Sequence, residues 1–526
     1  MKIFLTKLLC LATALCLVMG LAVGCGGSAE RESAAASAEG TQSTDGGETN
    51  RQETANPSDE QPFGTPPEGM GQPPAGERPE GTPPGGMGQP PAGERPEGTP
   101  PGGMGQPPSG GMPGGGPGGS SADIDYKGAV EITDADSQSD QIYAADAVDE
   151  SALLISTSET VYITNPTVTK TGSSNGGDSC NFYGLNAAVL VKDGANVTIT
   201  GGTITSDASG ANGVFSYGGN GGHNGAEGDG TIVTVRDTVI TTTGSGSGGI
   251  MTTGGGITYA YDLTVTTSGQ SSAPIRTDRG GGTVYVDGGT YTSNGLGSPT
   301  IYSTAEIHVS NATLLSNLSE GVCIEGKNSI ELTDCDLTAN NIRMNSNAGF
   351  LDTIMIYQSM SGDADSGTSS FTMTGGRLTS KSGHVFHVTN TNAIIYLNNV
   401  AILNEDAENI LLSVCADGWS GASNIATLNA TGQALAGTIL VGSDSTLTLN
   451  LTEGSVFIGT VSGNITNAKG SVVSTEVGTV NVTLDGTSTW ALTGDTYITS
   501  FTGDAANVVS NGYTLYVNGV ALTGTK

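Results

Sequence analysis

Charged and aromatic side chains are scarce in this sequence. Of its 526 residues only 13% are charged and 5% are aromatic, whereas roughly a quarter of the residues of an ordinary soluble domain are charged. Basic residues are the rarest charged type, with 18 Lys and Arg against 51 Asp and Glu, for a net charge of −33. A surface of this sign repels a phosphate backbone. The composition therefore excludes nucleic-acid binding.

The chain has few of the residues that favour helices and many of those that favour turns and strands. The chain contains 83 glycines and is rich in Thr, Ser, Asn and Val. Glycine and Asn favour turns, while Val and Thr favour strands. Helical faces need Ala, Leu, Glu, Lys and Arg instead. The composition predicts an all-β protein.

Closely spaced pairs of cysteines are missing after Cys25. The four later cysteines are Cys180, Cys323, Cys335 and Cys415, and none forms a C-x-x-C pair. Such pairs are typical of zinc sites and of redox-active thiols. We therefore expect these four thiols to be buried structural groups. A disulfide between Cys323 and Cys335 is disfavoured because the two occupy different positions of the repeat described below.

Residues 1–24 have the features of an export signal. Two early lysines precede an apolar run from Leu8 to Val23, a length and polarity typical of a secretory signal peptide. The segment ends in Leu-Ala-Val-Gly-Cys, which resembles a bacterial lipobox. That resemblance implies that Cys25 receives a lipid and becomes the new N-terminus. An ordinary signal peptide cleaved nearby is the alternative.

Residues 25–122 form a predicted disordered tether. Eighteen of the 21 prolines lie here, and three near-copies of one Pro- and Gly-rich unit begin at Gly64, Gly81 and Gly98. Proline pairs favour extended polyproline II, while Gly restores flexibility. We expect a spacer that holds the following domain away from a membrane.

The remaining residues contain a recurring decapeptide. Apolar residues occupy its positions 1, 3 and 8, with turn residues near positions 5 and 6. Most successive copies start roughly 24 residues apart, a period within the range of known solenoid repeats. The intervals from Val197 to Val233 and from Ile330 to Phe371 are longer. Weaker copies follow at Ile425, Leu447 and Val480. The eight clear copies begin at Val197, Val233, Thr258, Val284, Ile307, Ile330, Phe371 and Ile395.

This period predicts a parallel β-solenoid of about a dozen rungs. Two or three short alternating strands per repeat, with Gly and Asn at the corners, describe one coil that must stack on its neighbours to bury its apolar side. The pattern resembles the right-handed parallel β-helix superfamily that includes pectate lyases, polygalacturonases and bacterial surface adhesins. We expect the β-helix over 151–490, an N-terminal cap over 123–150 and a C-terminal cap over 491–526.

The resemblance to pectate lyases and polygalacturonases brings no catalytic residue with it. The sequence has no Asn-Thr-Asp, no adjacent Asp pair, no Gly-His-Gly and no Arg-Ile-Lys. These are the elements that the two enzyme signatures require. An enzyme is therefore the weaker interpretation of this fold.

One predicted column of side chains offers a candidate ligand-binding face. Aligning the second strand of each coil brings Val214, Ile250, Ile275, Ile301 and Val322 into register, which places polar side chains on the outer side. We expect Arg276→Ala to weaken ligand retention without unfolding the domain. An alternative interpretation pairs Arg276 with Asp278, and Glu325 with Lys327 or Arg279, as a solvated ladder. The candidate residues are Arg276, Asp278, Arg279, Tyr302, Glu325 and Lys327.

A glycine-rich insertion offers oxygen ligands for a metal ion. Calcium prefers carboxylate and amide oxygens, and the segment 218–230 contains several. It does not match the nonapeptide repeat that binds calcium in secreted proteins, and a loop without metal is the alternative. The candidate ligands are Asn220, Asn224, Glu227 and Asp229.

Together these features predict a lipid-anchored protein exported to the cell surface. Its β-helix would serve attachment, through binding of polysaccharide or another surface ligand, with no organic cofactor and with calcium as an option. The alternative is an exported polysaccharide lyase or glycoside hydrolase on the same fold, with Arg276, Asp278 and Glu325 as the acid and base groups.

Overall fold

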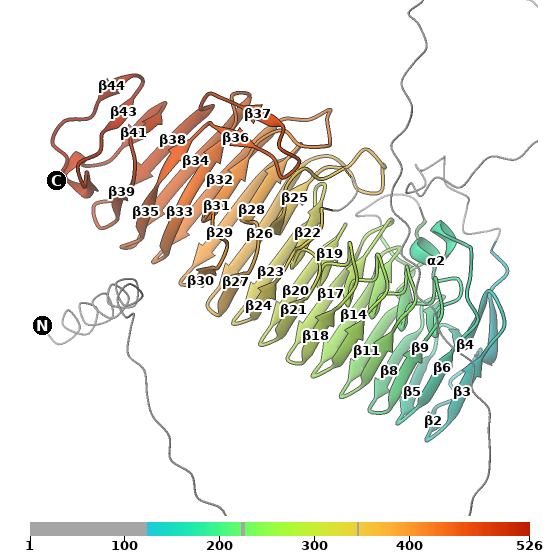
Figure 1. Ribbon diagram of the computed structural model, residues 1–526. Helices are drawn as coiled ribbons and strands as arrows, with labels where there is room; N and C mark the ends of the chain where they lie inside the picture. The colour runs from blue at the N-terminus through green and yellow to red at the C-terminus, as the bar shows by residue number, and fades with distance from the viewer. Residues whose placement is uncertain (1–123, 222–226, 345–346) are drawn as a thin grey trace, which may run out of the picture. The chain divides into compact units, whose positions relative to one another are not determined.

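The computed structural model describes residues 124–221, 227–344 and 347–526. Parallel strands stack coil upon coil, from the blue N-terminal strands to the red C-terminal strands in Figure 1. Three long sheets of 15, 14 and 10 strands run along the stack, which we call sheets A, B and C. This architecture confirms the predicted parallel β-helix. Cys25 and the predicted tether lie outside the described residues.

Sheet A contains 15 parallel strands. They are β1 (Lys127–Ile132), β4 (Glu150–Ser156), β7 (Val189–Lys192), β10 (Val214–Tyr217), β13 (Ile250–Thr253), β16 (Ile275–Thr277), β19 (Ile301–Ser303), β22 (Val322–Glu325), β25 (Asp352–Tyr357), β28 (His384–Thr389), β31 (Ile410–Val414), β33 (Ala434–Val441), β35 (Val456–Ser462), β39 (Thr489–Leu492) and β42 (Val508–Val509).

Sheet B contains 14 parallel strands. They are β2 (Gln138–Ser139), β5 (Thr160–Thr164), β8 (Asn196–Thr200), β11 (Ile232–Arg236), β14 (Gly256–Tyr261), β17 (Gly282–Asp287), β20 (Glu306–Ser310), β23 (Ser329–Thr333), β26 (Thr368–Thr374), β29 (Asn392–Asn398), β32 (Asn424–Thr431), β34 (Ser445–Thr452), β38 (Thr479–Leu484) and β41 (Ser500–Thr502).

Sheet C contains ten parallel strands and ends before the other two. They are β3 (Ile142–Ala145), β6 (Thr167–Lys170), β9 (Thr203–Ser206), β12 (Val239–Thr242), β15 (Thr264–Thr267), β18 (Thr290–Ser293), β21 (Thr313–Ser316), β24 (Asp336–Ala339), β27 (Arg377–Ser380) and β30 (Ala401–Asn404). Small elements complete the chain: α2 (Asp178–Tyr183), β36 (Ile465–Thr466), β37 (Val472–Ser474), β40 (Thr496–Ile498), β43 (Leu515–Val517), β44 (Val520–Ala521) and the 3-10 turn η2 (Ala505–Asn507).

The eight clear decapeptides stack in the predicted register. Val197 pairs with Val233, Val233 with Thr258, and so on in an unbroken chain to Ile395. The weaker copies leave this register, because Ile395 pairs with Leu428 rather than with Ile425, and Leu428 with Leu449 rather than with Leu447. Leu447 and Val480 do pair with each other. β32 and β34 are long strands that alternate inward and outward residues along their whole length. The decapeptide pattern predicts an inward Ile425, but this residue lies on the outward side at the start of β32, and the buried residues begin at Ala426.

The corner between sheets B and C is turned by one residue in the left-handed conformation. Asp237 and Asn311 have φ of 50° and 55°, a region that Asn, Asp and Gly tolerate best. The turn does not interrupt the ladder between coils, since the amide of Asp237 donates to the Tyr261 carbonyl at 3.0 Å. Gly and Asn turn six of the nine corners named below, as predicted, and Asp turns the other three. The corner residues are Asn165, Gly201, Asp237, Asp262, Gly288, Asn311, Asp334, Gly375 and Asn399.

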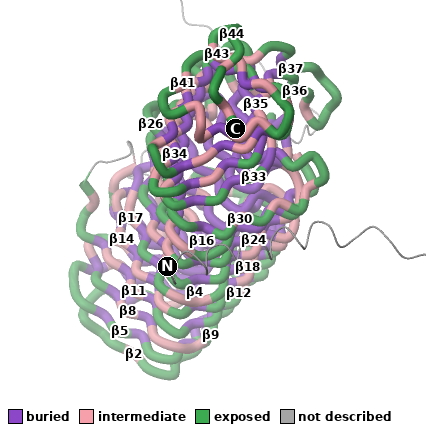
Figure 2. Tube along the Cα trace, turned by 90° about the vertical axis from the view of Figure 1, so that its left-hand side faces the viewer, coloured by how far each residue is buried: buried purple, intermediate pink, exposed green. Residues whose placement is uncertain are grey.

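The three sheets differ in how many of their faces are buried. Strands of sheet B alternate, as in β17 and β20, where outward residues are exposed or half-buried and inward ones are buried. β10, β28 and β31 of sheet A are buried at every position. A strand that is buried throughout must be covered on both sides. From β4 to β31 the outer face of sheet A is therefore a second interior, whereas β1, β33 and β35 have exposed outward residues. Sheets B and C face solvent, as the alternating purple and green or pink segments of Figure 2 illustrate.

Insertions at the ends of sheet A strands provide this cover. Residues 171–188, between β6 and β7, contain α2. The described residues 218–221 and 227–231 lie between β10 and β11, and 347–351 and 358–367 lie on either side of β25. In Figure 1 the insertion with α2 and the β36–β37 hairpin lie along one edge of the coils, and β24, β27 and β30 lie along the opposite edge. A separate apolar cluster forms between the insertion with α2 and sheet A, from Leu154, Phe182, Tyr183, Ala187, Leu190, Phe215, Tyr217 and Met251.

Both ends of the solenoid are continuous with its sheets. Residues 127–145, expected as a cap, give one strand to each sheet and make up the first coil. At the other end, the buried Trp490 donates from its indole nitrogen to the Gly459 carbonyl at 3.0 Å. Beyond it, β40, β43 and β44 form a small separate sheet on which Tyr497 and Tyr516 stack at 4.7 Å.

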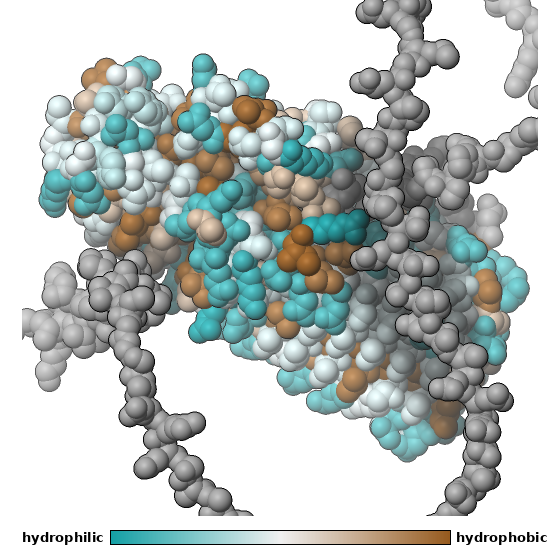
Figure 3. All heavy atoms as spheres, in the orientation of Figure 1, coloured by the Kyte–Doolittle hydropathy of each residue, from teal (hydrophilic) through white to brown (hydrophobic). Residues whose placement is uncertain are grey.

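All four cysteines of the described chain are buried and unpaired, as the sequence predicted. The side of the molecule seen in Figure 3 is a mosaic in which hydrophobic residues stay in small groups among hydrophilic ones. Within the described residues no helix has both the length and the apolar character needed to cross a bilayer.

Candidate functional site

The predicted column on sheet A is in the expected register. Ile250 pairs with Ile275, and Arg276 pairs with Tyr302, which in turn pairs with Cys323. Their side chains point away from the interior of the coil, as period-two alternation requires. The sequence therefore placed these residues correctly along the sheet.

The expected open face does not exist, because the insertion with α2 covers it. The Arg276 guanidinium contacts the Asn181 side chain at 3.4 Å, and the Arg279 guanidinium lies 4.2 Å from the Phe182 ring centroid. Each of the two arginine side chains is only 12% exposed. Lys327 is the one predicted binding residue in this group that is exposed.

The arginines are paired with carboxylates, of which Asp278 is buried and Asp363 is half-buried. Arg276 contacts Asp278 at 2.6 Å, and Arg279 contacts Asp363 at 2.5 Å. Burial raises the pKa of Asp278 to about 6, although the Arg276 charge acts in the opposite direction. The predicted pair between Arg276 and Asp278 is thus confirmed, but it lies beneath a cover instead of in solvent.

Glu325 binds hydroxyl groups rather than a lysine or an arginine. Its carboxylate accepts from the Tyr302 hydroxyl at 2.5 Å and from the Tyr357 hydroxyl at 3.0 Å. Ser359 and Ser361 donate to its other oxygen. The alternative ladder, with Glu325 bound to Lys327 or Arg279, is therefore wrong. These donors fix the 358–367 insertion to sheet A.

A second polar group lies deeper under the covers, around two histidines. His384 and His387 each contact the Ser413 hydroxyl, at 2.7 and 2.8 Å, and His387 contacts Asp417 at 3.3 Å. The Phe350 ring packs against both imidazoles. Ser413 and His387 have no exposed surface, so a substrate has no access to this serine, histidine and aspartate. We therefore infer that these polar residues have a structural role and help to hold the covering insertions against sheet A.

The glycine-rich insertion is only partly described. Asn224 lies outside the described residues, and Glu227 is exposed. The Asp229 carboxylate accepts from the amide and the hydroxyl of Thr231, at 2.9 and 2.7 Å. Within the described ranges no three His, Cys, Asp or Glu side chains are grouped closely enough to hold a metal ion. Calcium at this segment stays a prediction.

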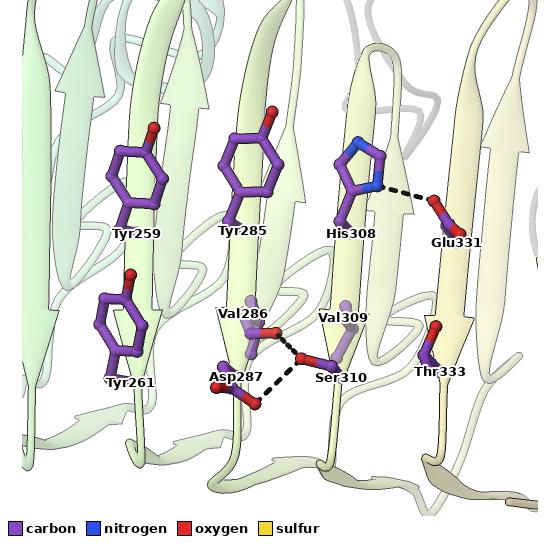
Figure 4. Close-up of a pocket in the computed structure, with 10 residues that line it drawn as sticks. All are labelled: Tyr259, Tyr261, Tyr285, Val286, Asp287, His308, Val309, Ser310, Glu331 and Thr333. Atoms are coloured by element: carbon purple, nitrogen blue, oxygen red, sulfur yellow. Dashed lines mark hydrogen bonds and ion pairs between the residues drawn. The ribbon is translucent and has the colours of Figure 1, made fainter.

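The open face of sheet B carries a row of aromatic side chains. Tyr259 and Tyr285 stack with ring centroids 5.1 Å apart and planes at 11°, and Tyr285 and His308 stack at 5.0 Å and 9°. Figure 4 shows the three rings in line across β14, β17 and β20, with Tyr261 and Asp287 in a second row beside them. The row exists because these residues are direct partners in the parallel register.

The rings border a shallow hollow of about 450 Å³ that is open to solvent. We call it the sheet B platform. Tyr285 is 39% exposed although it is stacked on both sides. Partial burial and the nearby Glu306 charge raise the pKa of Tyr285, so its hydroxyl stays a hydrogen-bond donor. The platform is lined by Tyr259, Tyr261, Tyr285, Val286, Asp287, His308, Val309, Ser310, Glu331 and Thr333.

Charged groups border the two ends of the platform differently. At one end the Arg236 guanidinium lies 3.7 Å from the centroid of the Tyr261 ring. At the other end His308 lies between two carboxylates, with Nε2 2.8 Å from Glu306 and Nδ1 3.0 Å from Glu331. A rigid surface thus combines aromatic faces with hydrogen-bonding groups of both signs.

Sequence reasoning missed this platform, although a signal was present. Position 2 of three consecutive decapeptides is Tyr259, Tyr285 and His308. Positions 1 and 3 are inward, so position 2 must be outward. In contrast, the sheet A strands have apolar or aromatic residues on both faces, which indicates a covered strand.

Comparison of the chain with family models, with curated proteins and with solved structures gave no match.

Because Arg276 is in a buried ion pair, we expect Arg276→Ala to lower the free energy of unfolding. The sequence alone suggests that it would weaken ligand retention without unfolding the domain. Removing the guanidinium leaves the Asp278 carboxylate buried without its partner, which costs about 3–5 kcal/mol for comparable pairs. The loss should be larger at pH 8 than at pH 5, because Asp278 is neutralised below a pKa of about 6. Chemical denaturation at both pH values measures it. Arg377→Ala, at an exposed position of sheet C, is the control, and equal stability of the two variants would contradict the assignment.

The histidine group predicts acid sensitivity. Burial and the neighbouring His387 lower the pKa of His384 to about 3, so the folded protein keeps this imidazole neutral while the unfolded chain protonates it near pH 6.5. Its contribution to stability is present above pH 6.5 and is lost as the pH falls toward 3, by roughly 2–3 kcal/mol at pH 4.5.

We expect His384→Gln to flatten the decline of unfolding free energy between pH 7 and pH 4.5. The raised pKa values of the buried Glu320 and Asp352 act with the opposite sign, but they are common to both proteins and cancel in the comparison. His308→Gln, at a partly exposed position, is the matched control. A parallel decline in wild type and His384→Gln would refute the burial of a neutral imidazole.

Proposed function

We propose that this protein is an attachment protein of the cell surface that binds polysaccharide on the sheet B platform. The observation that carries the proposal is the row of Tyr259, Tyr285 and His308 on an uncovered rigid sheet. Aromatic rings present apolar faces to sugar rings, and their polar tips and neighbours donate to hydroxyl groups. The ~4.8 Å spacing of strands in a sheet is comparable with the length of one sugar residue in an extended chain.

The geometry also favours a polymer over a small molecule. The platform is shallow and runs across four adjacent strands, β14 to β23, along the axis of the solenoid. Small ligands bind in concave pockets that bury most of their surface. An extended chain can instead lie across successive coils and contact one ring after another.

The alternative function, a polysaccharide lyase or hydrolase, is not supported by the residues that the sequence suggested as its acid and base groups. Asp278 is held by Arg276, and Glu325 by tyrosine and serine hydroxyls, both beneath the covers. A hydrolase needs two carboxylates facing each other across the sugar. On the platform the carboxylates of Glu306 and Glu331 both contact the single imidazole of His308.

We further propose that lipidated Cys25 anchors the chain to the outer face of the membrane and that residues 25–122 act as the tether. The support is the lipobox-like end of the apolar segment and the Pro and Gly content of the residues that follow. An attachment function needs such a link between the binding face and the cell.

The platform proposal predicts that Tyr259→Ala with Tyr285→Ala weakens binding on the order of tenfold, since each lost aromatic contact costs about 0.5–1.5 kcal/mol. The measurement is retardation of the purified full-length chain in native gels that contain neutral or acidic polysaccharides, with and without calcium. The control is Tyr162→Ala with Tyr396→Ala, two exposed tyrosines of sheet B whose strand partners are not aromatic. Equal retardation of both double variants would refute the platform, and a track cleared of polymer would indicate an enzyme.

The anchor proposal predicts that Cys25→Ser releases the protein from membranes. The lipid supplies the membrane affinity in this proposal, so the variant should move to the aqueous phase in detergent partitioning while the wild type stays with the detergent. Ser substitution at Cys16, within the apolar run, is the control. Retention of Cys25→Ser with the detergent phase would rule out this anchor.

A further inference from the structure

Three acidic side chains lie on or beside the half of the sheet B platform formed by β17, β20 and β23: Asp287 and Glu331 line it, and Glu306 borders it through His308. Asp287 is exposed on β17, and the side chains of Glu306 and Glu331, on β20 and β23, are 54% and 51% exposed. These strands are neighbours in the sheet. Figure 4 shows Glu331 next to His308 at the end of the aromatic row, and Asp287 in the second row, on the strand of Tyr285.

These carboxylates keep acceptor capacity for a ligand. His308 contacts Oε1 of Glu306 and Oε2 of Glu331, and within the described part of the chain the second oxygen of each carboxylate has no hydrogen-bond donor. Asp287 accepts from Ser310 at 3.0 Å and from Asn311 at 2.7 Å, which lowers its pKa and keeps it ionised in mild acid. A carboxylate can accept about four hydrogen bonds.

The charge of this half decides between classes of sugar polymer. A chain of uronic acids would bring its own carboxylates next to these three and would be repelled. A neutral polymer would use the rings but would not make use of the charges. A sugar ammonium group donates three hydrogen bonds and carries the complementary charge, and bonds between an ammonium and a carboxylate are about twice as strong as neutral ones.

We propose that the sheet B platform recognises glycans with free amino groups, that is, polymers containing amino sugars that are not acetylated. The aromatic row contacts the sugar ring faces, and Asp287, Glu306 and Glu331 bind the ammonium groups. This assignment rests on the proposed function of the platform and names its ligand class.

The test compares two oligosaccharides of equal length that differ only in the amine. The purified full-length protein is titrated with a glucosamine hexamer and with the corresponding N-acetylglucosamine hexamer, at pH 6 and low salt. We expect the amine form to bind about tenfold more tightly, which corresponds to ~1.4 kcal/mol. The advantage should shrink in 0.5 M salt, where the Debye length falls to only a few ångströms.

Two triple variants test whether the preference for the amine form comes from the platform carboxylates or from the negative net charge of the whole chain. Asp287→Asn with Glu306→Gln and Glu331→Gln should abolish the preference for the amine form and leave binding of the acetylated form unchanged. The control removes the same three charges elsewhere, by Glu159→Gln with Glu405→Gln and Glu408→Gln, at exposed positions. If both triple variants lose the preference equally, the attraction belongs to the net charge and the assignment is overturned.

The remaining outcomes separate the two proposals. Equal binding of both hexamers, reduced by Tyr259→Ala with Tyr285→Ala, would overturn the amino-sugar assignment and support glycan binding on the platform. Tighter binding of a galacturonic acid hexamer than of either would overturn the assignment as well. Failure to bind any of the three, together with unhindered migration in every polysaccharide gel, would overturn both proposals.

Discussion

Hydrogen bonding between the backbones of successive coils determines where the side chains of sheets A, B and C lie. Each strand pairs in parallel with the equivalent strand of the next coil, so a residue type repeated at one position of the sequence becomes a column on the surface or in the core. The left-handed corners maintain this ladder between sheets B and C, because the corner amides bond to the next coil. The core and the aromatic platform are both consequences of this single constraint.

The same constraint explains why the three sheets have different roles. Extra residues cannot enter a strand without shifting its register, so they enter where sheet A strands begin and end. There they fold back over sheet A and create a second interior, in which charges such as Arg276 and Asp278 are paired and hydroxyl donors satisfy Glu325. Among the described residues, sheet B has no such cover between β11 and β23, and its outward residues remain available to a ligand.

Periodicity in the sequence was sufficient to predict the fold and much of the register. The column from Val214 to Val322 and the eight clear decapeptides were placed correctly. The phase failed at Ile425, an apolar residue that lies on the outward side of β32, because an outward apolar residue gives the same local signal as an inward one. The candidate site was misplaced for a different reason. Whether Arg276 is open or covered depends on where α2 folds, and α2 is distant in sequence, so local pattern does not contain that information.

The coil-by-coil construction of the platform has a consequence for how such a protein can evolve. Duplication of one whole coil would add one more position to the aromatic row at the same spacing and leave every older position unchanged. Insertion of an odd number of residues inside a strand would instead turn the following outward residues inward. Gene duplication in units of one decapeptide interval, such as that from Val284 to Ile307, is therefore a direct genetic route to a longer binding surface.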